Sequence, residues 1–384
     1  MRIPSIAACL LLIAANSARA ITPEQEAVAR KGLDSLYQND FAGAESAFGD
    51  SSRAHPDDPL YSLGAAVAAW WRMESAFALP GSRDEDSFKA AVERAIETGK
   101  KAVDRDKSAD AHLYLATGFG LRARRRAANR QWFRAYLDGR RAHRYAQKAL
   151  ELDPALIDAN LGIGAFDYYV ATLSRLVRTL AFATGGDRSQ GLLRLETAAA
   201  QGRFSQIPAK LVLVGIYWTF EKKPEEAWRL IEDVTRQYPD SPMVREMRLV
   251  GRFQLRDAPG LEKDARAFLA SAQSGARYFQ PIDRVVGRGF LGLARQLSSD
   301  PGSALLEYQA AWDETPPGHR WRSALALFKG EALDLLGRRQ EAVSEYERAL
   351  REAPLWGVHR YARRLLDRPF KAGDDPLPSR GAEL

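Results

Sequence analysis

Residues 330–354 read GEALDLLGRRQEAVSEYERALREAP, with Gly330, Ala342 and Pro354 spaced twelve residues apart. The same spacing occurs three more times: first in Gly32, Ala44 and Pro56, then in Gly215, Ala227 and Pro239, and again in Gly292, Ala304 and Pro316. Glycine and alanine lack bulk, so two antiparallel helices can approach closely where they lie. Proline ends the second helix because it cannot donate a backbone hydrogen bond and its ring crowds the preceding turn. The spacing therefore predicts a pair of antiparallel helices that recurs along the chain.

The residues between the alanine and the proline strengthen this prediction. In every copy an apolar or aromatic residue follows the alanine by four positions, namely Phe48, Ile231, Tyr308 and Tyr346. This pattern resembles the tetratricopeptide repeat, a helix–turn–helix unit of about 34 residues. One such unit cannot bury its apolar face alone, whereas stacked units can. The resemblance implies an all-α, right-handed superhelical solenoid of roughly eight helix pairs, in a protein of the secreted bacterial type.

The first twenty residues have the layout of a secretory signal peptide. Arg2 precedes an apolar run over residues 6–15, and small residues surround a cleavage site after Ala20. The run is too short to span a bilayer. We expect cleavage near Ala20 and a periplasmic or secreted location. The only cysteine, Cys9, would leave with this segment, and a lipoprotein interpretation of Cys9 is disfavoured because few apolar residues precede it.

The rest of the chain predicts one continuous array. We assign residues 21–368 to the solenoid, with an insert near 173–186, and residues 356–367 to a closing helix that covers the last apolar face. Residues 369–384 are rich in Pro, Gly, Asp and Ser and predict a disordered tail. The run FATGGDRSQGLLRLETA, residues 182–198, is similar to a short segment of a eukaryotic repeat family that includes a mitochondrial outer-membrane inclusion-clearance protein. We transfer no function from so short a match.

Motifs that would indicate an enzyme are missing from the sequence. No two of the five histidines have the spacing of a zinc-hydrolase helix, and there is no nucleophile elbow or phosphate-binding loop. The glycines of residues 287–292 match a dinucleotide pattern, but they lie in a predicted helix without a preceding strand. We therefore expect a non-catalytic protein with no cofactor and no metal. An enzyme acting on the cell wall would need a cluster of acids in the groove.

Residues 122–148 form a strongly basic segment with a single acid, Asp138. Its basic residues are Arg122, Arg124, Arg125, Arg126, Arg130, Arg134, Arg140, Arg141, Arg144 and Lys148, and Trp132, Phe133 and Tyr136 are interleaved with them. One interpretation is a face that binds acidic proteins, anionic lipid head groups or a cell-wall polymer. The other is a pair of solvated helix faces whose arginine stems cover apolar neighbours. A secreted protein rarely meets nucleic acid, so we expect none as a partner.

The insert carries apolar residues at helical spacing, with Arg175 and Arg178 on the opposite side. An amphipathic, cationic helix of this kind can lie on a membrane surface or fill a partner's groove. The alternative is an extra helix that folds onto the core of the solenoid itself.

The function predicted from these features is a protein-interaction scaffold of the cell envelope. Repeat arrays present a concave surface, which here would hold a peptide or a protein, possibly an acidic one. The candidate contact residues are Tyr114, Tyr168, Tyr217 and Trp218, together with Arg122, Arg124, Arg125, Arg126, Arg130, Trp132, Arg140 and Arg141. The second hypothesis is a peripheral factor attached to the membrane or cell wall through the basic segment and the insert.

Overall fold

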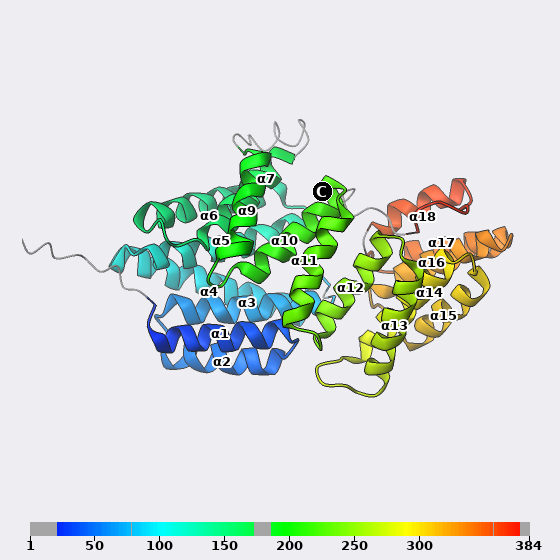
Figure 1. Ribbon diagram of the computed structural model, residues 1–384, viewed down its shortest axis with the longest axis horizontal. Helices are drawn as coiled ribbons and strands as arrows, with labels where there is room; N and C mark the ends of the chain where they lie inside the picture. Colours follow the sequence, from blue (N-terminus) through cyan, green and yellow to red (C-terminus); the bar gives the residue numbers. More distant parts are fainter. Residues whose placement is uncertain (1–20, 78, 173–185, 356, 377–384) are drawn as a thin grey trace, which may run out of the picture.

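The computed structural model describes residues 21–77, 79–172, 186–355 and 357–376. Over these residues the chain forms seventeen α-helices and one short π-helix, and no strand occurs among them (Figure 1). The predicted signal peptide lies outside the described residues, as does most of the insert. None of the described helices combines the length and the apolar character that spanning a membrane requires.

The helices follow one another as antiparallel pairs. The first four pairs are α1 (Pro23–Tyr37) with α2 (Phe41–Ala54), α3 (Pro59–Ser75) with α4 (Arg83–Asp106), α5 (Ala109–Ala128) with α6 (Trp132–Leu152), and α7 (Ala159–Thr172) with α9 (Arg188–Gln201). The next four are α10 (Gln206–Ile216), extended by the π-helix η1 (Tyr217–Glu221), with α11 (Pro224–Gln237); α12 (Pro242–Gln254) with α13 (Ala258–Gln273); α14 (Pro281–Leu297) with α15 (Pro301–Glu314); and α16 (Trp321–Leu335) with α17 (Arg339–Arg351). A last helix, α18 (Val358–Asp367), covers the end of the array.

Short polar side chains fix where several of these helices begin. Asp40, Ser82 and Ser108 precede α2, α4 and α5, and each accepts a hydrogen bond from an N–H of the first turn. Such caps satisfy backbone donors that have no partner inside the helix. The local sequence therefore sets the helix boundaries, while packing between pairs sets their arrangement.

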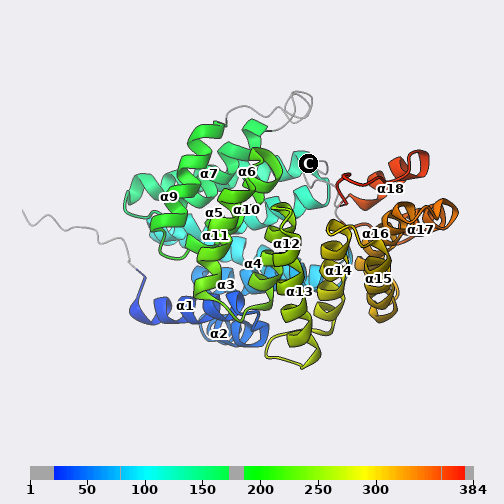
Figure 2. The same cartoon turned by 45° about the vertical axis from the view of Figure 1, so that its right-hand side comes forward.

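Stacking of the pairs makes a solenoid. Each helix contacts the next along the chain, and the first helices of successive pairs also contact one another, as in α1 with α3, α3 with α5 and α14 with α16. The prediction of an all-α superhelical solenoid with a closing helix is confirmed. In Figures 1 and 2 the helices up to α11 form one lobe, and α12–α18 form a second lobe beside it.

The alanines and prolines of the repeated spacing belong to the second helix of each pair and to its end. The four alanines are fully buried in α2, α11, α15 and α17, and they are Ala44, Ala227, Ala304 and Ala342. The four prolines lie in the connections that directly follow these helices, and they are Pro56, Pro239, Pro316 and Pro354. A larger side chain at any of these alanines would have to displace a packed neighbour.

The repeat glycines of three copies lie against the aromatic residue of their own pair. A Cβ atom added at Gly330 would lie 2.4 Å from Cε1 of Tyr346, and one at Gly292 would lie 2.3 Å from Cε1 of Tyr308. In the first copy the added Cβ of Gly32 would lie 2.3 Å from the ring of Phe48. Only glycine leaves room for these rings, which explains the spacing that the sequence repeats.

The copy that begins at Gly215 has a different geometry. A Cβ atom added there would have no neighbour within 4 Å, and the chain continues into the π-helix η1 directly after α10. In this region the closely packed glycine is instead Gly251, where an added Cβ would lie 2.8 Å from Cε3 of Trp228. The extra residue per turn in a π-helix shifts the register of the side chains that follow.

The first pair also contacts the fifth and sixth pairs, so the solenoid folds back on itself. Tyr37 of α1 is buried, and its ring packs edge-on against Tyr238, 5.4 Å away between centroids. The hydroxyl of Tyr238 donates to Oδ1 of Asp34 at 2.7 Å, and Arg203 forms an ion pair with Glu26. These contacts join residues about two hundred positions apart.

A further contact joins the two lobes. Phe77, after the end of α3, packs edge-on against Trp321 at the start of α16, with ring centroids 6.2 Å apart. Trp321 is fully buried in the largest core cluster, which runs through the second lobe.

Residues 369–376, which we assigned to the disordered tail, pack on the second lobe. Phe370 is buried in the core cluster of that lobe, and its N–H donates to Oδ2 of Asp334 at 2.8 Å. The composition that suggested disorder serves here to form a tight turn, with Gly373 at φ 89°. The ordered chain therefore continues beyond the boundary at residue 368, and residues 377–384 lie outside the described part.

Candidate functional site

The basic segment spans the end of α5 and most of α6, and its arginines divide into an inner and an outer set. The inner set surrounds Asp138 of α6, whose side chain is fully buried. Asp138 accepts from Nε of Arg122 at 2.8 Å, from Nη1 of Arg126 at 2.5 Å and from Nη1 of Arg141 at 3.1 Å. A buried carboxylate is stable only when such donors compensate for its lost hydration. Arg122 and Arg126 therefore hold α5 and α6 together.

Arg125 belongs to a second buried ion pair, with Glu85 at the start of α4. Nε of Arg125 donates to Oε1 of Glu85 at 2.7 Å, and Nδ2 of Asn129 donates to the same oxygen at 3.0 Å. Gly81 donates its N–H to the other oxygen at 2.6 Å. Burial raises the pKa of Glu85, but these donors together with Lys89 outweigh it and lower the pKa to about 2. Arg125 is thus a structural residue and is not available to a partner.

The outer set consists of exposed arginines that have no carboxylate partner among the described residues. Arg140 and Arg144 lie on α6, and their guanidinium carbons lie 5.9 Å and 5.3 Å from the ring centroids of Tyr136 and Tyr145. The same holds on α5, where Arg124 lies 5.0 Å over Trp70. Stacking on rings holds the guanidinium groups in place without neutralising them. The basic segment therefore contains arginines that are paired inside the protein as well as arginines that are exposed.

The exposed cations of α6 lie in one row, which we call the arginine stripe. It comprises Arg134, Arg140, Arg144 and Lys148, together with Arg141, which donates to Asp138 but stays 49% exposed. Successive positions are six, one, three and four residues apart, which at 3.6 residues per turn places them on one side of the helix. At 1.5 Å per residue the stripe is roughly 21 Å long. Phe133 is exposed next to its first member, with 53% of its surface accessible. Arg130 and Trp132 lie just before the stripe, the first exposed and the second half-buried.

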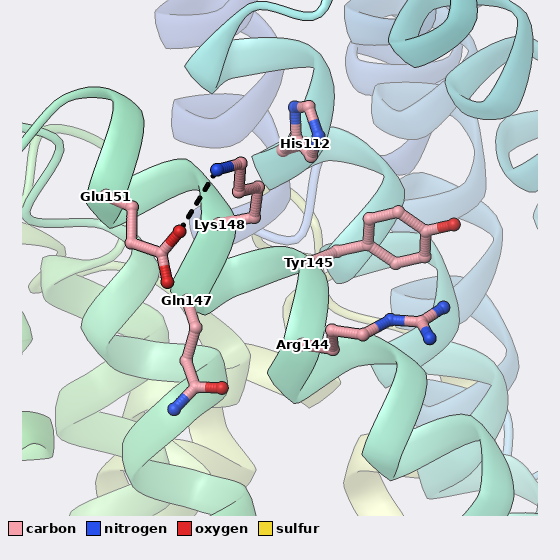
Figure 3. A pocket seen from close by; sticks show the side chains of 6 residues that line it. All are labelled: His112, Arg144, Tyr145, Gln147, Lys148 and Glu151. Carbon is pink, nitrogen blue, oxygen red and sulfur yellow. Dashed lines mark hydrogen bonds and ion pairs between the residues drawn. The ribbon is translucent and has the colours of Figure 1, made fainter.

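A shallow pocket of about 340 Å³ lies at the far end of the stripe. It is lined by His112 of α5 and by Arg144, Tyr145, Gln147, Lys148 and Glu151 of α6 (Figure 3). Nζ of Lys148 lies 3.1 Å from Oε2 of Glu151, and the other polar ends point in different directions (Figure 3). The pocket therefore extends the stripe but does not converge on one small molecule.

His112 has a structural role at the edge of this pocket. Its Nδ1 lies 2.7 Å from the backbone oxygen of Ser108. A carbonyl oxygen only accepts hydrogen bonds, so Nδ1 carries the proton. The ring also packs at 6.0 Å from that of Tyr145.

The aromatic residues expected in the concave groove are largely engaged within the protein. Tyr168 is fully buried, and its hydroxyl donates to Oε1 of Glu221 at 2.5 Å. Tyr217 donates to Oε1 of Glu196 at 3.0 Å. These hydrogen bonds and the burial of the rings raise the pKa of both hydroxyls, with burial the larger cause.

Tyr114 and Trp218 are half-buried. Tyr114 packs beside Tyr61 and Phe204, where the first and fifth pairs meet, and burial raises the pKa of its hydroxyl. Trp218 packs against the cluster around Ile231, and its buried indole nitrogen has no hydrogen-bond partner among the described residues. Tyr217 thus packs in one cluster with Tyr168 and in another with Trp218, whereas Tyr114 lies in a different part of the core.

Within the described ranges, no three His, Cys, Asp or Glu side chains are grouped so that they could hold a metal ion. The residues that organise the basic segment, Asp138 and Glu85, were not among the predicted site residues. The isolated acid in a run of ten cations was a usable signal for Asp138. Glu85 gave no such signal, because it lies forty residues from its partner Arg125.

No family model and no curated protein matches the chain. Similar solved structures include a tetratricopeptide repeat protein from Parabacteroides merdae, with 10% identity over 90% of this chain and 98% of that chain and a TM-score of 0.35. Yeast Tom70 has 10% identity over 88% and 87% of the two chains and a TM-score of 0.44. The human IFIT1 dimer with PPP-AAAA has 12% identity over 91% and 88%, and a TM-score of 0.45. The similarity does not extend to the ligands of these proteins. By its own helix pairing and glycine–aromatic packing, the chain is a solenoid of the tetratricopeptide type.

Proposed function

We propose that the protein is a non-catalytic interaction scaffold of the bacterial cell envelope that binds an acidic protein or peptide through the arginine stripe. The observation that carries this proposal is the row of exposed cations on α6, of which Arg134, Arg140 and Arg144 have no carboxylate partner among the described residues. Unneutralised cations in one row attract an anionic surface and orient it. The layout of residues 1–20 supports the envelope location.

The stripe fits an extended acidic segment better than a small ligand. Its cations are distributed along the helix, whereas the adjoining pocket lacks convergent donors. Arginine presents a planar fork of donors that matches a carboxylate, so each member can bind one acidic side chain. Phe133 adds an exposed apolar contact at one end. Because Tyr168 and Tyr217 are engaged internally, binding on this outer face replaces binding in the concave groove as the favoured mode.

The experiment measures binding of a fluorescein-labelled decaglutamate peptide to residues 21–384 by fluorescence anisotropy. The test variant combines Arg134→Glu, Arg140→Glu and Arg144→Glu. The control variant combines Arg94→Glu, Arg351→Glu and Arg363→Glu, three exposed arginines away from the stripe that also have no ion pair among the described residues. Both variants change the net charge equally, so a general charge effect would weaken binding to the same extent.

We expect the test variant to bind at least about tenfold more weakly, which is about 1.4 kcal/mol, and the control to bind within about threefold of the unmodified protein. Equal losses in both variants would show that the stripe is not a site. A parallel measurement uses vesicles of phosphatidylglycerol. Binding to vesicles without binding to the peptide, lost only in the stripe variant, would favour the peripheral-membrane hypothesis.

The envelope location has its own measurement. Fractionation of cells that express the full chain should place the protein in the periplasm or the medium, with a mature N-terminus near Ile21. Recovery of the uncleaved chain from the cytoplasm would contradict the location and leave the stripe unaffected.

A further inference from the structure

Residues 368–376, which we call the C-terminal strap, leave the end of α18 and turn back over the second lobe (Figure 2). The strap forms one tight turn, in which the N–H of Lys371 donates to Oδ2 of Asp374 at 3.1 Å and the N–H of Asp374 donates to the backbone oxygen of Lys371 at 3.0 Å. Arg368 donates to both carboxylate oxygens of Asp374, at 2.8 Å and 2.9 Å. The turn is therefore held by contacts within the strap.

The two sides of this turn are attached to the lobe at separate points. On one side, Phe370 inserts into the core cluster and its N–H donates to Asp334 of α16. On the other side, Oδ1 of Asp375 lies 3.2 Å from Nη2 of Arg256, directly after α12, and the backbone oxygen of Asp375 accepts from the hydroxyl of Tyr361 of α18. Pro376 is buried. The residues between the two points, 371–373, are exposed.

The strap contacts α16, the end of α12 and α18. The first two are first helices of their pairs, and α18 is the closing helix. α12, α14, α16 and α18 contact one another in this order, so they form one side of the second lobe. The strap spans this row from α18 to the end of α12. It attaches to these helices at two ends, with the side chain of Phe370 in the core cluster and that of Asp375 at the far edge.

The conformation of Arg256 favours binding of that acid. It has a left-handed backbone conformation, with φ 57°, and its guanidinium carbon lies 4.8 Å from the ring centroid of Phe253. The stacked ring restricts the guanidinium, so the arginine loses little freedom when it binds a carboxylate. Arg256 remains 46% exposed in the pair. A carboxylate from another chain can therefore reach it.

We propose that the row α12–α16–α18 is a peptide-binding surface occupied by the strap, and that it accepts a partner segment with an aromatic residue followed five positions later by an acid. Phe370 and Asp375 define this spacing. The surface is separate from the arginine stripe, so it goes beyond the function proposed above. Because the strap is covalently attached, its effective concentration is on the order of millimolar, and it competes strongly with any free segment.

The test uses a variant that ends at Asp367 and a fluorescein-labelled peptide with the sequence of residues 368–376. We expect the shortened protein to bind this peptide at least tenfold more tightly than the full chain does. The peptide with Phe370→Ala should lose binding, and the peptide with Asp375→Asn should weaken to the same level as the unmodified peptide on a shortened protein with Arg256→Ala. Circular dichroism and thermal unfolding establish that each protein is folded.

Removal of the strap exposes part of the core and can unfold the protein. A second variant that keeps the strap is therefore tested as well. The full chain with Phe370→Ala keeps the strap but detaches its aromatic anchor, and it should bind the labelled peptide more tightly than the unmodified full chain. The proposal is overturned if a folded shortened protein does not bind the peptide or binds the Phe370→Ala peptide equally well. It is also overturned if the full-length Phe370→Ala variant binds no better than the unmodified chain.

Discussion

Nε of Arg122 lies 2.8 Å from Oδ2 of Asp138, and the aspartate is fully buried between α5 and α6. The most basic segment of the chain is therefore organised around an anion. Arg126 and Arg141 donate to the same carboxylate. Charges that the sequence presents as one block thus separate into cations that join helices and cations that face solvent.

The first prediction concerns this carboxylate. Asp138→Ala should lower the free energy of unfolding by about 3 kcal/mol, because it leaves half-buried guanidinium groups without their acceptor. The matched control is Glu93→Ala, since Glu93 also pairs with Arg122 but is 57% exposed. An exposed pair contributes under about 1 kcal/mol. Denaturant unfolding of both variants checks the prediction, and similar losses would show that Asp138 does not organise the segment.

The second prediction is a dependence on pH that originates at Glu85. Its pKa is lowered from 4.5 to about 2 in the folded protein, so the folded state binds fewer protons than the unfolded state as the pH falls through this range. The stabilisation is fully present above pH 4.5 and is lost between about pH 4.5 and pH 2; it corresponds to roughly 3 kcal/mol. Glu85→Gln should therefore destabilise the protein at pH 7 and much less at pH 3.

Unfolding measured at both pH values compares Glu85→Gln with the unmodified protein. Glu97→Gln serves as the control, because Glu97 lies on the same helix and its side chain is 70% exposed. A destabilisation by Glu85→Gln of equal size at pH 7 and pH 3 would contradict the assigned shift of the pKa. Arg125→Glu should also destabilise the folded protein, but for a different reason, because it places a second carboxylate against that of Glu85.

The third prediction compares two glycines that hold the same position in the sequence pattern. Gly330→Ala forces a Cβ to within 2.4 Å of the ring of Tyr346 and should cost about 1–3 kcal/mol by overpacking. Gly215→Ala meets no atom within 4 Å and should stabilise the helix by about 0.5–1 kcal/mol, because alanine loses less backbone entropy. Thermal unfolding of both variants checks the prediction, and a loss of stability for Gly215→Ala would contradict the absence of a packed neighbour at Gly215.

These two glycines show how far the sequence predicts the fold. The spacing around Gly330 is a local property of two adjacent helices, and local periodicity identifies it. The open space at Gly215 and the π-helix that follows it at residues 217–221 have no signature in the repeat pattern. The contact of Tyr37 with Tyr238 was also beyond prediction, because it depends on the twist accumulated over five pairs.

The candidate site was predictable in part for a related reason. The density of arginine marked residues 122–148 at once, but the exposure of each arginine depends on the rotation of α6 against α5. Asp138 fixes that rotation by drawing Arg122 and Arg126 inward. Arg140 and Arg144 remain outside because they lie on the opposite side of the helix. Composition identifies the segment, and only the packing shows which cations a partner can reach.

The last prediction concerns Glu331 of α16, a fully buried acid in the second lobe. Its Oε2 accepts from Nε2 of Gln296 at 3.3 Å, and its Oε1 has no hydrogen-bond partner among the described residues. Burial raises the pKa of Glu331 well above 4.5, and the nearby carboxylates of Asp375, Asp334 and Asp374 add to the effect, although the hydrogen bond from Gln296 opposes it. Burial therefore favours the neutral acid form of this side chain in the folded protein.

The sign of the resulting pH dependence is opposite to that at Glu85. Above pH 4.5 the unfolded chain loses the proton of Glu331 while the folded chain keeps it, so stability falls by up to about 1.4 kcal/mol for each pH unit until the folded pKa is reached. Glu331→Gln carries no such proton, so its stability relative to the unmodified protein should rise as the pH increases from 4.5 toward the folded pKa of Glu331. Burial raises the pKa of Asp283 to about 6, but Asp283 titrates in both proteins and cancels from the difference. Unfolding free energies at pH 5, 6.5 and 8 test this, and a constant difference would mean that Glu331 is ionised in the folded state.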